Sequence, residues 1–154
     1  PHSIKLVRQA DPDKPTNCYQ HAFEIDYIVT RKVSELALPD MHLGSKFVSG
    51  FLIPKLTEIT QQQAKNVDYI IYFDAKSVTH AGIITDNRVN SKWGEGHIYE
   101  HKPEEVPADY GLEAKFYTKI PGELATKTFV EYVKLDGNYG AVLDYLHDWL
   151  PSYF

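Results

Sequence analysis

Short turns divide residues 67–103 into four runs of β-forming residues, and this feature constrains the fold most. The runs are "VDYIIYFD", "KSVTHAGIIT", "RVNSKWGE" and "HIYEHKP". They are rich in the β-branched and aromatic residues that strands favour. The turns between them include Asp86-Asn87 and Gly94-Glu95-Gly96. Runs joined in this way pair as neighbours, so the sequence predicts a meander of antiparallel strands.

Helical patterns precede the predicted strands. The segment "CYQHAFEIDYIV", residues 18–29, has apolar residues at nearly the helical period, and Thr16 or Asn17 can cap its start. Prolines and glycines predict a long irregular segment over residues 31–55 with short helical pieces. The glutamine-rich stretch at residues 55–65 predicts a polar helix.

The remaining segments complete a single α+β domain over residues 1–154. Residues 1–15 form an extended lead-in with a short strand at "SIKLV", and "AKFYTKI" is a fifth strand of the central region. The tail "NYGAVLDYLHDWLPSYF" predicts a closing amphipathic helix stopped by Pro151. With 154 residues, of which 43% are hydrophobic, the chain can bury one substantial core.

Composition and hydropathy argue against two kinds of partner, nucleic acid and the membrane interior. The formal net charge of −5 gives no basic excess for nucleic acid, and no apolar run approaches the length of a membrane span. The N-terminal stretch "PHSIKLVRQADPDKP" lacks the apolar centre of a signal peptide. Location therefore stays open between the cytoplasm and a secreted effector. We expect a monomer that binds a peptide or protein substrate.

Cys18 is the single cysteine of the chain and lies at the predicted helix start. The first turn of a helix offers free backbone N–H groups and the positive end of the helix dipole, and both favour a thiolate. Cys18 is therefore a candidate nucleophile. The alternative is a buried small hydrophobe, which is a common environment for a lone cysteine.

A histidine within reach of the sulfur could take the thiol proton and later return it to a leaving amine. The candidates are His21, His80, His97 and His101. His21 lies three residues after Cys18, so distance alone does not exclude it. We favour His80, at the head of the run "HAGIIT", because a base from the sheet leaves the substrate side of the helix free. The alternative for His80 is a strand-end histidine bonded to a backbone carbonyl.

Gly82 and the hairpin turn bear on how His80 would be oriented. Gly82 faces the same way as His80 and leaves room for a helix end or a substrate chain. A third group usually holds the second ring nitrogen of a catalytic histidine. A two-residue turn at Asp86-Asn87 places Ser91 on the face of His80, whereas a three-residue turn places Asn90 there.

These residues carry a family resemblance. The string "NCYQHAF", followed by "YIIYFDAKSVTHAGII", resembles the papain-like cysteine peptidases of the NlpC type. In that family a cysteine at a helix start meets a histidine written His-x-Gly-[Ile/Val]. The strings "NSKWGEGHIYEH" and "VPADYG" are similar to a group of bacterial domains that carry "SKWG" and "YG" after the same histidine. The resemblance covers roughly residues 16–118 and depends on the Cys and His motifs together.

The resemblance implies a papain-like fold, with a nucleophile helix packed on an antiparallel sheet. It implies Cys18 as nucleophile and His80 as base, with no cofactor. At the third catalytic position a histidine is common in the family, whereas this chain offers Asn90, Ser91 or Lys92.

Three functions follow from this reading. The first is an amide hydrolase that acts through a thioester. The second is a deamidase or transglutaminase-like effector acting on a protein side-chain amide. The third is a binding domain that keeps the fold without turnover.

The sequence also offers candidate residues for an oxyanion hole, for substrate contact and for a metal site. The Cys18 backbone amide and Asn17 are candidate oxyanion donors. Trp93 either contacts substrate or fills the core beside the sheet, with Lys92 solvated. His97 and His101 share one strand face and could bind a metal ion with His80, but no cysteine or carboxylate ligand lies at a familiar spacing.

Overall fold

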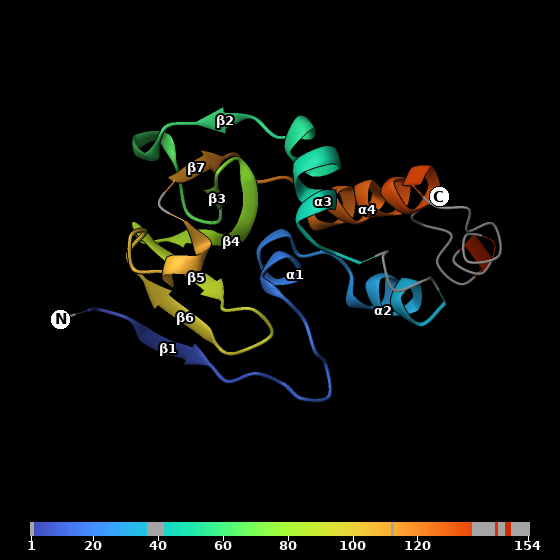
Figure 1. Ribbon diagram of the computed structural model, residues 1–154, viewed down its shortest axis with the longest axis horizontal. Helices are drawn as coiled ribbons and strands as arrows, with labels where there is room; N and C mark the ends of the chain where they lie inside the picture. Colours follow the sequence, from blue (N-terminus) through green and yellow to red (C-terminus); the bar gives the residue numbers. More distant parts are fainter. Residues whose placement is uncertain (1, 37–41, 112, 137–143, 145–146, 149–154) are drawn as a thin grey trace.

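The computed structural model describes residues 2–36, 42–111, 113–136, 144 and 147–148. Its centre is a seven-stranded antiparallel sheet in the order β1-β6-β5-β4-β3-β7-β2 (Figure 1). The strands are β1 (Lys5–Arg8), β2 (Glu58–Ile59), β3 (Tyr69–Asp74), β4 (Ser77–Thr85), β5 (Arg88–Lys92), β6 (Ile98–His101) and β7 (Glu113–Tyr117). The protein is thus a mixed α+β fold with one antiparallel sheet.

The predicted meander is confirmed as the run β3-β4-β5-β6. The turn between β4 and β5 has two residues, because Thr85 pairs with Arg88. Its residues, Asp86 and Asn87, have φ angles of 51° and 64°. Both angles lie in the left-handed region that tight hairpin turns require and that Asp and Asn tolerate.

The outer strands come from distant parts of the chain. Strand β1 pairs with β6, which confirms a strand within the predicted "SIKLV" segment. Strand β7, predicted as a fifth strand, does not extend the meander at β6. It pairs with β3 on one side and β2 on the other. The sheet is therefore assembled by pairing between segments that no local turn connects.

Two predicted helices differ from the structure. The segment 18–29 contains α1 (Cys18–Phe23) and the start of α2 (Tyr27–Leu36) instead of one helix. Glu24 breaks it in a left-handed conformation with φ 55°. The break turns Ile25 into the core, where it is 3% exposed. Burial of Ile25 thus overrides the helical period of the sequence.

The polar helix predicted at 55–65 is wrong. This stretch forms β2 and the 3₁₀ turn η3 (Gln61–Gln63). Thr60 caps that turn, with Gln63 bonding back to it as a capping box. Backbone pairing of β2 with β7 replaces the hydrogen bonds a helix would have made.

The preceding irregular segment contains α3 (Ser45–Phe47), the π-helical turn η1 (Val48–Leu52) and the 3₁₀ turn η2 (Ile53–Lys55). Helix α4 (Gly122–Asp136), which the sequence analysis did not assign, follows β7. Phe129 of α4 packs edge to face on Phe47 at 5.3 Å between ring centroids. The closing helix predicted at 138–154 lies almost entirely outside the described residues. Among those described, no helix is long and apolar enough to cross a membrane.

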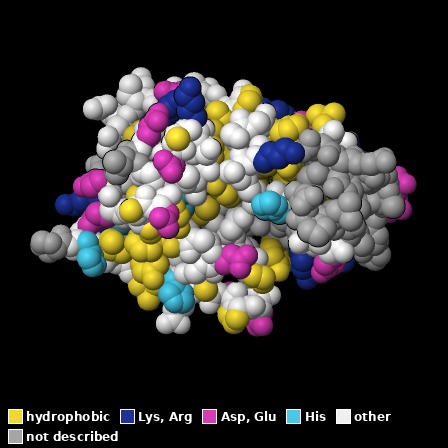
Figure 2. All heavy atoms as spheres, in the orientation of Figure 1, with side chains coloured by type: hydrophobic (Ala, Val, Ile, Leu, Met, Phe, Trp, Pro, Cys, Tyr) yellow, Lys and Arg dark blue, Asp and Glu magenta, His cyan; other side chains and the backbone are white. Residues whose placement is uncertain are grey.

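The two faces of the sheet carry separate cores. On one face Ile71 and Ala81 pack with Cys18 of α1 and with α4. On the other face Tyr72 packs with Val89 and with residues of the loop after β6. The helices lie on one side of the sheet in Figure 1. On the surface in Figure 2, Lys and Arg side chains lie among Asp and Glu side chains. The sheet therefore separates two buried environments, and a side chain's strand position decides which one it enters.

Candidate functional site

Cys18 opens helix α1, as predicted. Asn17 is the N-cap, and its Oδ1 accepts hydrogen bonds from the backbone N–H groups of Tyr19 at 3.1 Å and Gln20 at 3.0 Å. The Nδ2 of Asn17 donates to the carbonyl of Leu43 at 2.6 Å. Asn17 was predicted as an oxyanion donor, but its side-chain amide is used by the cap and by this contact. That prediction is not supported in the described state.

The Cys18 sulfur lies against the backbone of β4. The backbone N–H groups of Ala81, Tyr19 and Cys18 itself lie near enough to stabilise a negative charge there. The residue is 6% exposed. Burial raises the pKa of the thiol from 9.0 to about 11 and outweighs the effect of these N–H groups. Near neutral pH the group is therefore a thiol in this state.

His80 precedes Ala81 but extends to the opposite face of β4. Ala81 pairs with Ile71 on the α1 side, whereas His80 pairs with Tyr72 on the other side. Among the described residues, neither ring nitrogen of His80 has a hydrogen-bond partner. The predicted sharing of a proton between Cys18 and His80 is therefore not formed here. The physical reason is the alternation of side chains along a strand.

Aromatic rings surround His80. The ring of Tyr110 stacks on it at 4.1 Å between centroids and 12° between planes, and Tyr72 lies at 5.5 Å. His80 is 0% exposed. Burial lowers the pKa of His80 from 6.5 to about 3, with smaller contributions from His101 and His21. The imidazole is thus neutral, and the alternative of a bond to a backbone carbonyl is not found either.

The loop 102–111 covers His80. Its 3₁₀ turn η4 (Ala108–Tyr110) supplies the stacking ring, and Thr79 Oγ1 donates to the carbonyl of Tyr110. The hydroxyl of Tyr72 donates to the carbonyl of Pro103 at 2.6 Å. Gly111 closes the loop at φ 84°, where a Cβ would lie 2.2 Å from the carbonyl oxygen of Phe73. The motif string "VPADYG" therefore forms the cover over the histidine.

Ser91 shares the face of His80, as the two-residue turn predicts, but it serves another histidine. Its Oγ lies 2.7 Å from Nε2 of His101. Nδ1 of His101 lies 2.7 Å from the carbonyl of Lys102, so Nδ1 carries the proton and Nε2 accepts from Ser91. Burial lowers the pKa of His101, which keeps the ring neutral. Ser91 does not orient His80.

Asn90, the other candidate, faces α1. Its Oδ1 lies 2.6 Å from Nε2 of His21. Because Oδ1 can only accept, Nε2 carries the proton and Nδ1 is free to accept in the neutral ring. Burial is the main cause that lowers the pKa of His21, while the Asn90 hydrogen bond raises it. Asn90 was predicted as one of two candidates to orient His80, but in the structure it pairs with His21.

Two further expectations, for Gly82 and Lys92, need correction, while Trp93 stays open between its two predicted roles. Space over Gly82 is not open, because an added Cβ would meet Val89 at 2.8 Å and Ser91 at 2.9 Å. Lys92 is not solvated but 4% exposed. Trp93 is half-buried, and its ring packs on Tyr99 at 4.5 Å between centroids. Trp93 Nε1 is buried without a partner among the described residues. The packing of neighbouring strands, which sequence alone does not give, decides the surroundings of Gly82 and Lys92.

The histidine metal site is not assembled by the residues described. His97 lies outside β6, and its Nδ1 accepts from the backbone N–H of Ala10 at 2.7 Å. His101 is bonded to Ser91 and Lys102. In the described part of the chain, no three His, Cys, Asp or Glu side chains are grouped to bind a metal ion.

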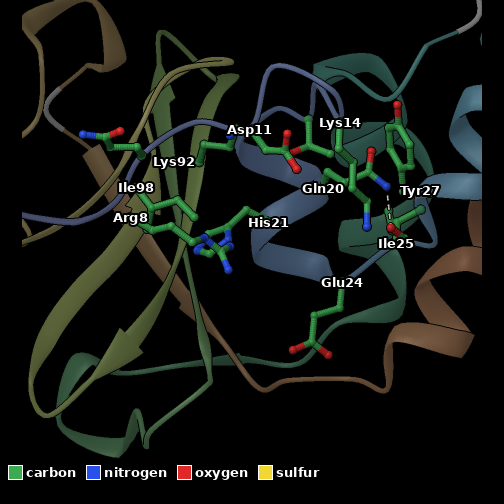
Figure 3. Close-up of a pocket in the computed structure, with 12 residues that line it drawn as sticks. Arg8, Asp11, Lys14, Gln20, His21, Glu24, Ile25, Tyr27, Lys92 and Ile98 are labelled. Carbon is green, nitrogen blue, oxygen red and sulfur yellow. Dashed lines mark hydrogen bonds between the residues drawn. The ribbon is translucent and has the colours of Figure 1, made fainter.

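An open pocket that the sequence analysis missed lies beside α1 (Figure 3). Its volume is about 480 Å³, and Arg8, His21 and Lys92 reach it from β1, α1 and β5. The strand period could have placed Asn90 and Lys92 on one face, but not beside a residue from the N-terminal lead-in. The pocket thus depends on the β1–β6 pairing.

Neither the family models, nor the curated proteins, nor the solved structures compared with this chain gave a match.

Proposed function

We propose that the protein is a thiol hydrolase that cleaves an amide bond of a peptide or protein, with Cys18 as nucleophile and His80 as base. One observation carries the proposal. The sulfur at the start of α1 packs on β4 beside Ala81, the residue that follows His80, and the Ala81 N–H favours its charged form. The fold thus places the Cys18 thiol, at the start of α1, beside the peptide bond that joins His80 to Ala81.

The state of His80 gives independent support. A buried imidazole whose nitrogens have no hydrogen bond to the described residues costs stability, since these residues do not replace the bonds that the nitrogens make to bulk water. A buried polar group that is left unbonded at such a cost is a candidate for a function other than folding. Because His80 is stacked under Tyr110 on the face opposite Cys18, the proposal requires two movements. The loop 102–111 must release the ring, and β4 must rearrange locally, at the bulge beside Tyr72 and Phe73, so that the imidazole reaches the sulfur.

The reaction would then follow the order expected for a cysteine and histidine pair. His80 takes the thiol proton, and the Cys18 sulfur attacks the amide carbonyl carbon. The imidazolium returns the proton to the departing nitrogen, leaving a thioester. Water, activated by the neutral imidazole, then cleaves the thioester and releases the acid and the free thiol.

A binding domain without turnover is the second candidate. The observation that favours it is the burial of the Cys18 sulfur, which raises its pKa to about 11. In that case Cys18 is a core residue, and the fold acts through a surface pocket instead.

The pH profile of Cys18 alkylation separates the two candidates. Because the chain has one cysteine, iodoacetamide reports on this site alone, and Cys18→Ser gives the background. If an open state pairs the sulfur with His80, labelling at pH 7 is at least about tenfold faster in the wild-type protein than in His80→Gln. If Cys18 is a core thiol, labelling rises only toward pH 11 and the two proteins behave alike.

Labelling that rises only toward pH 11, and that is equal in the wild-type protein and His80→Gln, would overturn the hydrolase proposal. His101→Gln serves as the control variant, because its ring is buried on the same face but lies next to Ser91. An equal loss of labelling in both variants would indicate a general structural effect and would also contradict a specific role for His80. For an active protein, mass spectrometry of products distinguishes hydrolysis of a chain from deamidation, which adds about one mass unit without cleavage.

A further inference from the structure

Lys92 is an unusual residue on the pocket beside α1. It lies on β5 and is 4% exposed, yet the part of the chain that is described offers its ammonium neither a hydrogen bond nor an ion pair within contact distance. The stem of the side chain is buried, while the ammonium borders the open pocket and has no described protein group paired with it. Glu95 and Asp11 act on Lys92 only through the longer-range field.

A second cation, Arg8, adds to the positive charge around Lys92. Arg8, at the end of β1, faces the same pocket and has no ion pair with another described residue (Figure 3). Burial lowers the pKa of Lys92, and the nearby Arg8 charge lowers it further. Two like charges held together on a pocket wall repel each other unless an anion lies between them.

His21 completes this wall. Asn90 holds Nε2 of its ring at 2.6 Å, and Arg8 and Lys92 both disfavour its charged form. In Figure 3 Arg8 and His21 border the same part of the pocket, and Lys92 extends from the sheet toward Asp11. The wall therefore presents two cations and a fixed imidazole from three separate elements.

Two other charged groups of the pocket have partners. Glu24 pairs with Lys119 at 3.2 Å, and Lys14 lies over the ring of Tyr27 at 5.2 Å. Asp11 accepts the backbone N–H of Asp13 at 2.9 Å and keeps its negative charge. The lining thus holds the cations Arg8, Lys14 and Lys92 against Asp11 and the paired Glu24, so its excess charge is positive. The pocket volume of about 480 Å³ is in the range that holds a small ligand.

We propose that Arg8, Lys92 and His21 form a binding site for an oxyanion group, a carboxylate or a phosphate, of a small ligand. The guanidinium can bind two oxygens of the group side by side, while the ammonium supplies a point charge. The site does not depend on thiol chemistry at Cys18.

Titration of the full chain with acetate or with inorganic phosphate tests the site. The readout is the NMR shift of the His21 ring signals, with chloride at matched ionic strength as reference. We expect saturable shifts with one or both anions, and Lys92→Met or Arg8→Gln weakens binding about tenfold. Tighter binding of acetate identifies a carboxylate ligand, and tighter binding of phosphate identifies a phosphate ligand.

Lys14→Gln is the matched control. It removes a cation from the same pocket but on the wall near Tyr27, so binding stays within about twofold of wild type. Shifts that equal those with chloride, or that all three variants reduce alike, would overturn the proposal. Loss of folding in Lys92→Met would also contradict it, because an ammonium kept for a ligand contributes no stability to the empty protein.

Discussion

His21 and His80 lie on opposite faces of the same pair of strands, and their surroundings differ in kind. His21 is half-buried, has one nitrogen fixed by Asn90 and borders an open pocket. His80 is fully buried between aromatic rings, with neither nitrogen bonded among the described residues. The first environment can bind a ligand without rearrangement. The second can act only if its cover moves.

The comparison concerns how well the histidines on the two faces of the sheet are hydrogen-bonded. His101 lies on the face of His80, yet Ser91 and Lys102 satisfy both its nitrogens. Burial on that face is therefore compatible with full hydrogen bonding, and His80 is the exception. This contrast separates a structural histidine from one that we propose for function.

Removing the cover from His80 has the largest expected effect. Gly111→Ala forces a Cβ toward the carbonyl oxygen of Phe73 at a φ of 84°. We expect a loss of about 3 kcal/mol in the free energy of unfolding. NMR titration should find the pKa of His80 raised toward 6.5, with His21 unchanged. Gly94→Ala is the control, because it has a φ of 61° but no atom near the added Cβ, and it costs about 1 kcal/mol.

Replacing the satisfied histidine has the next largest effect. His101→Phe leaves the buried Ser91 hydroxyl without its partner and removes the contact of the ring with the Lys102 carbonyl. Denaturant unfolding should measure a loss of about 2 kcal/mol. A double variant with Ser91→Ala should recover part of this loss. No recovery would mean that the hydroxyl finds another partner and that the contrast with His80 is weaker.

Replacing the unsatisfied histidine should have the opposite sign. His80→Phe keeps the stacking with Tyr110 and removes two unbonded nitrogens, so we expect a gain of about 1 kcal/mol at pH 7. The folded pKa of His80 lies near 3, below the unfolded value near 6.5, so protonation favours unfolding. The wild-type protein should therefore lose stability relative to His80→Phe as the pH falls from 6.5 toward 3. A gap between the two proteins that stays constant over this range would contradict the buried neutral ring.

The smallest effect is expected on the pocket side. Asn90→Ala removes the acceptor of His21, but solvent in the open pocket can replace it, so the cost is about 0.5 kcal/mol. The pKa of His21 should fall, because the Asn90 hydrogen bond raises it. Asn90→Asp should raise the pKa by adding a negative charge. Equal titration of His21 in both variants would show that Asn90 does not hold the ring.

Local pattern determined much of the architecture. The four strand runs, their short turns and the capped start of α1 are encoded by neighbours in the sequence, so the meander and the position of Cys18 were predictable. The two-residue turn also fixed the strand register, and with it the face that Ser91 occupies.

Tertiary structure alone decided the site. The bulge-containing pairing of β3 with β4 sets the faces of His80 and Ala81, and the loop that returns through Gly111 seals the imidazole. Pairing of β1 with β6 brings Arg8 to Lys92. Local periodicity says which residues share a face of a strand. It does not say which distant segment covers that face, because that choice depends on long-range packing.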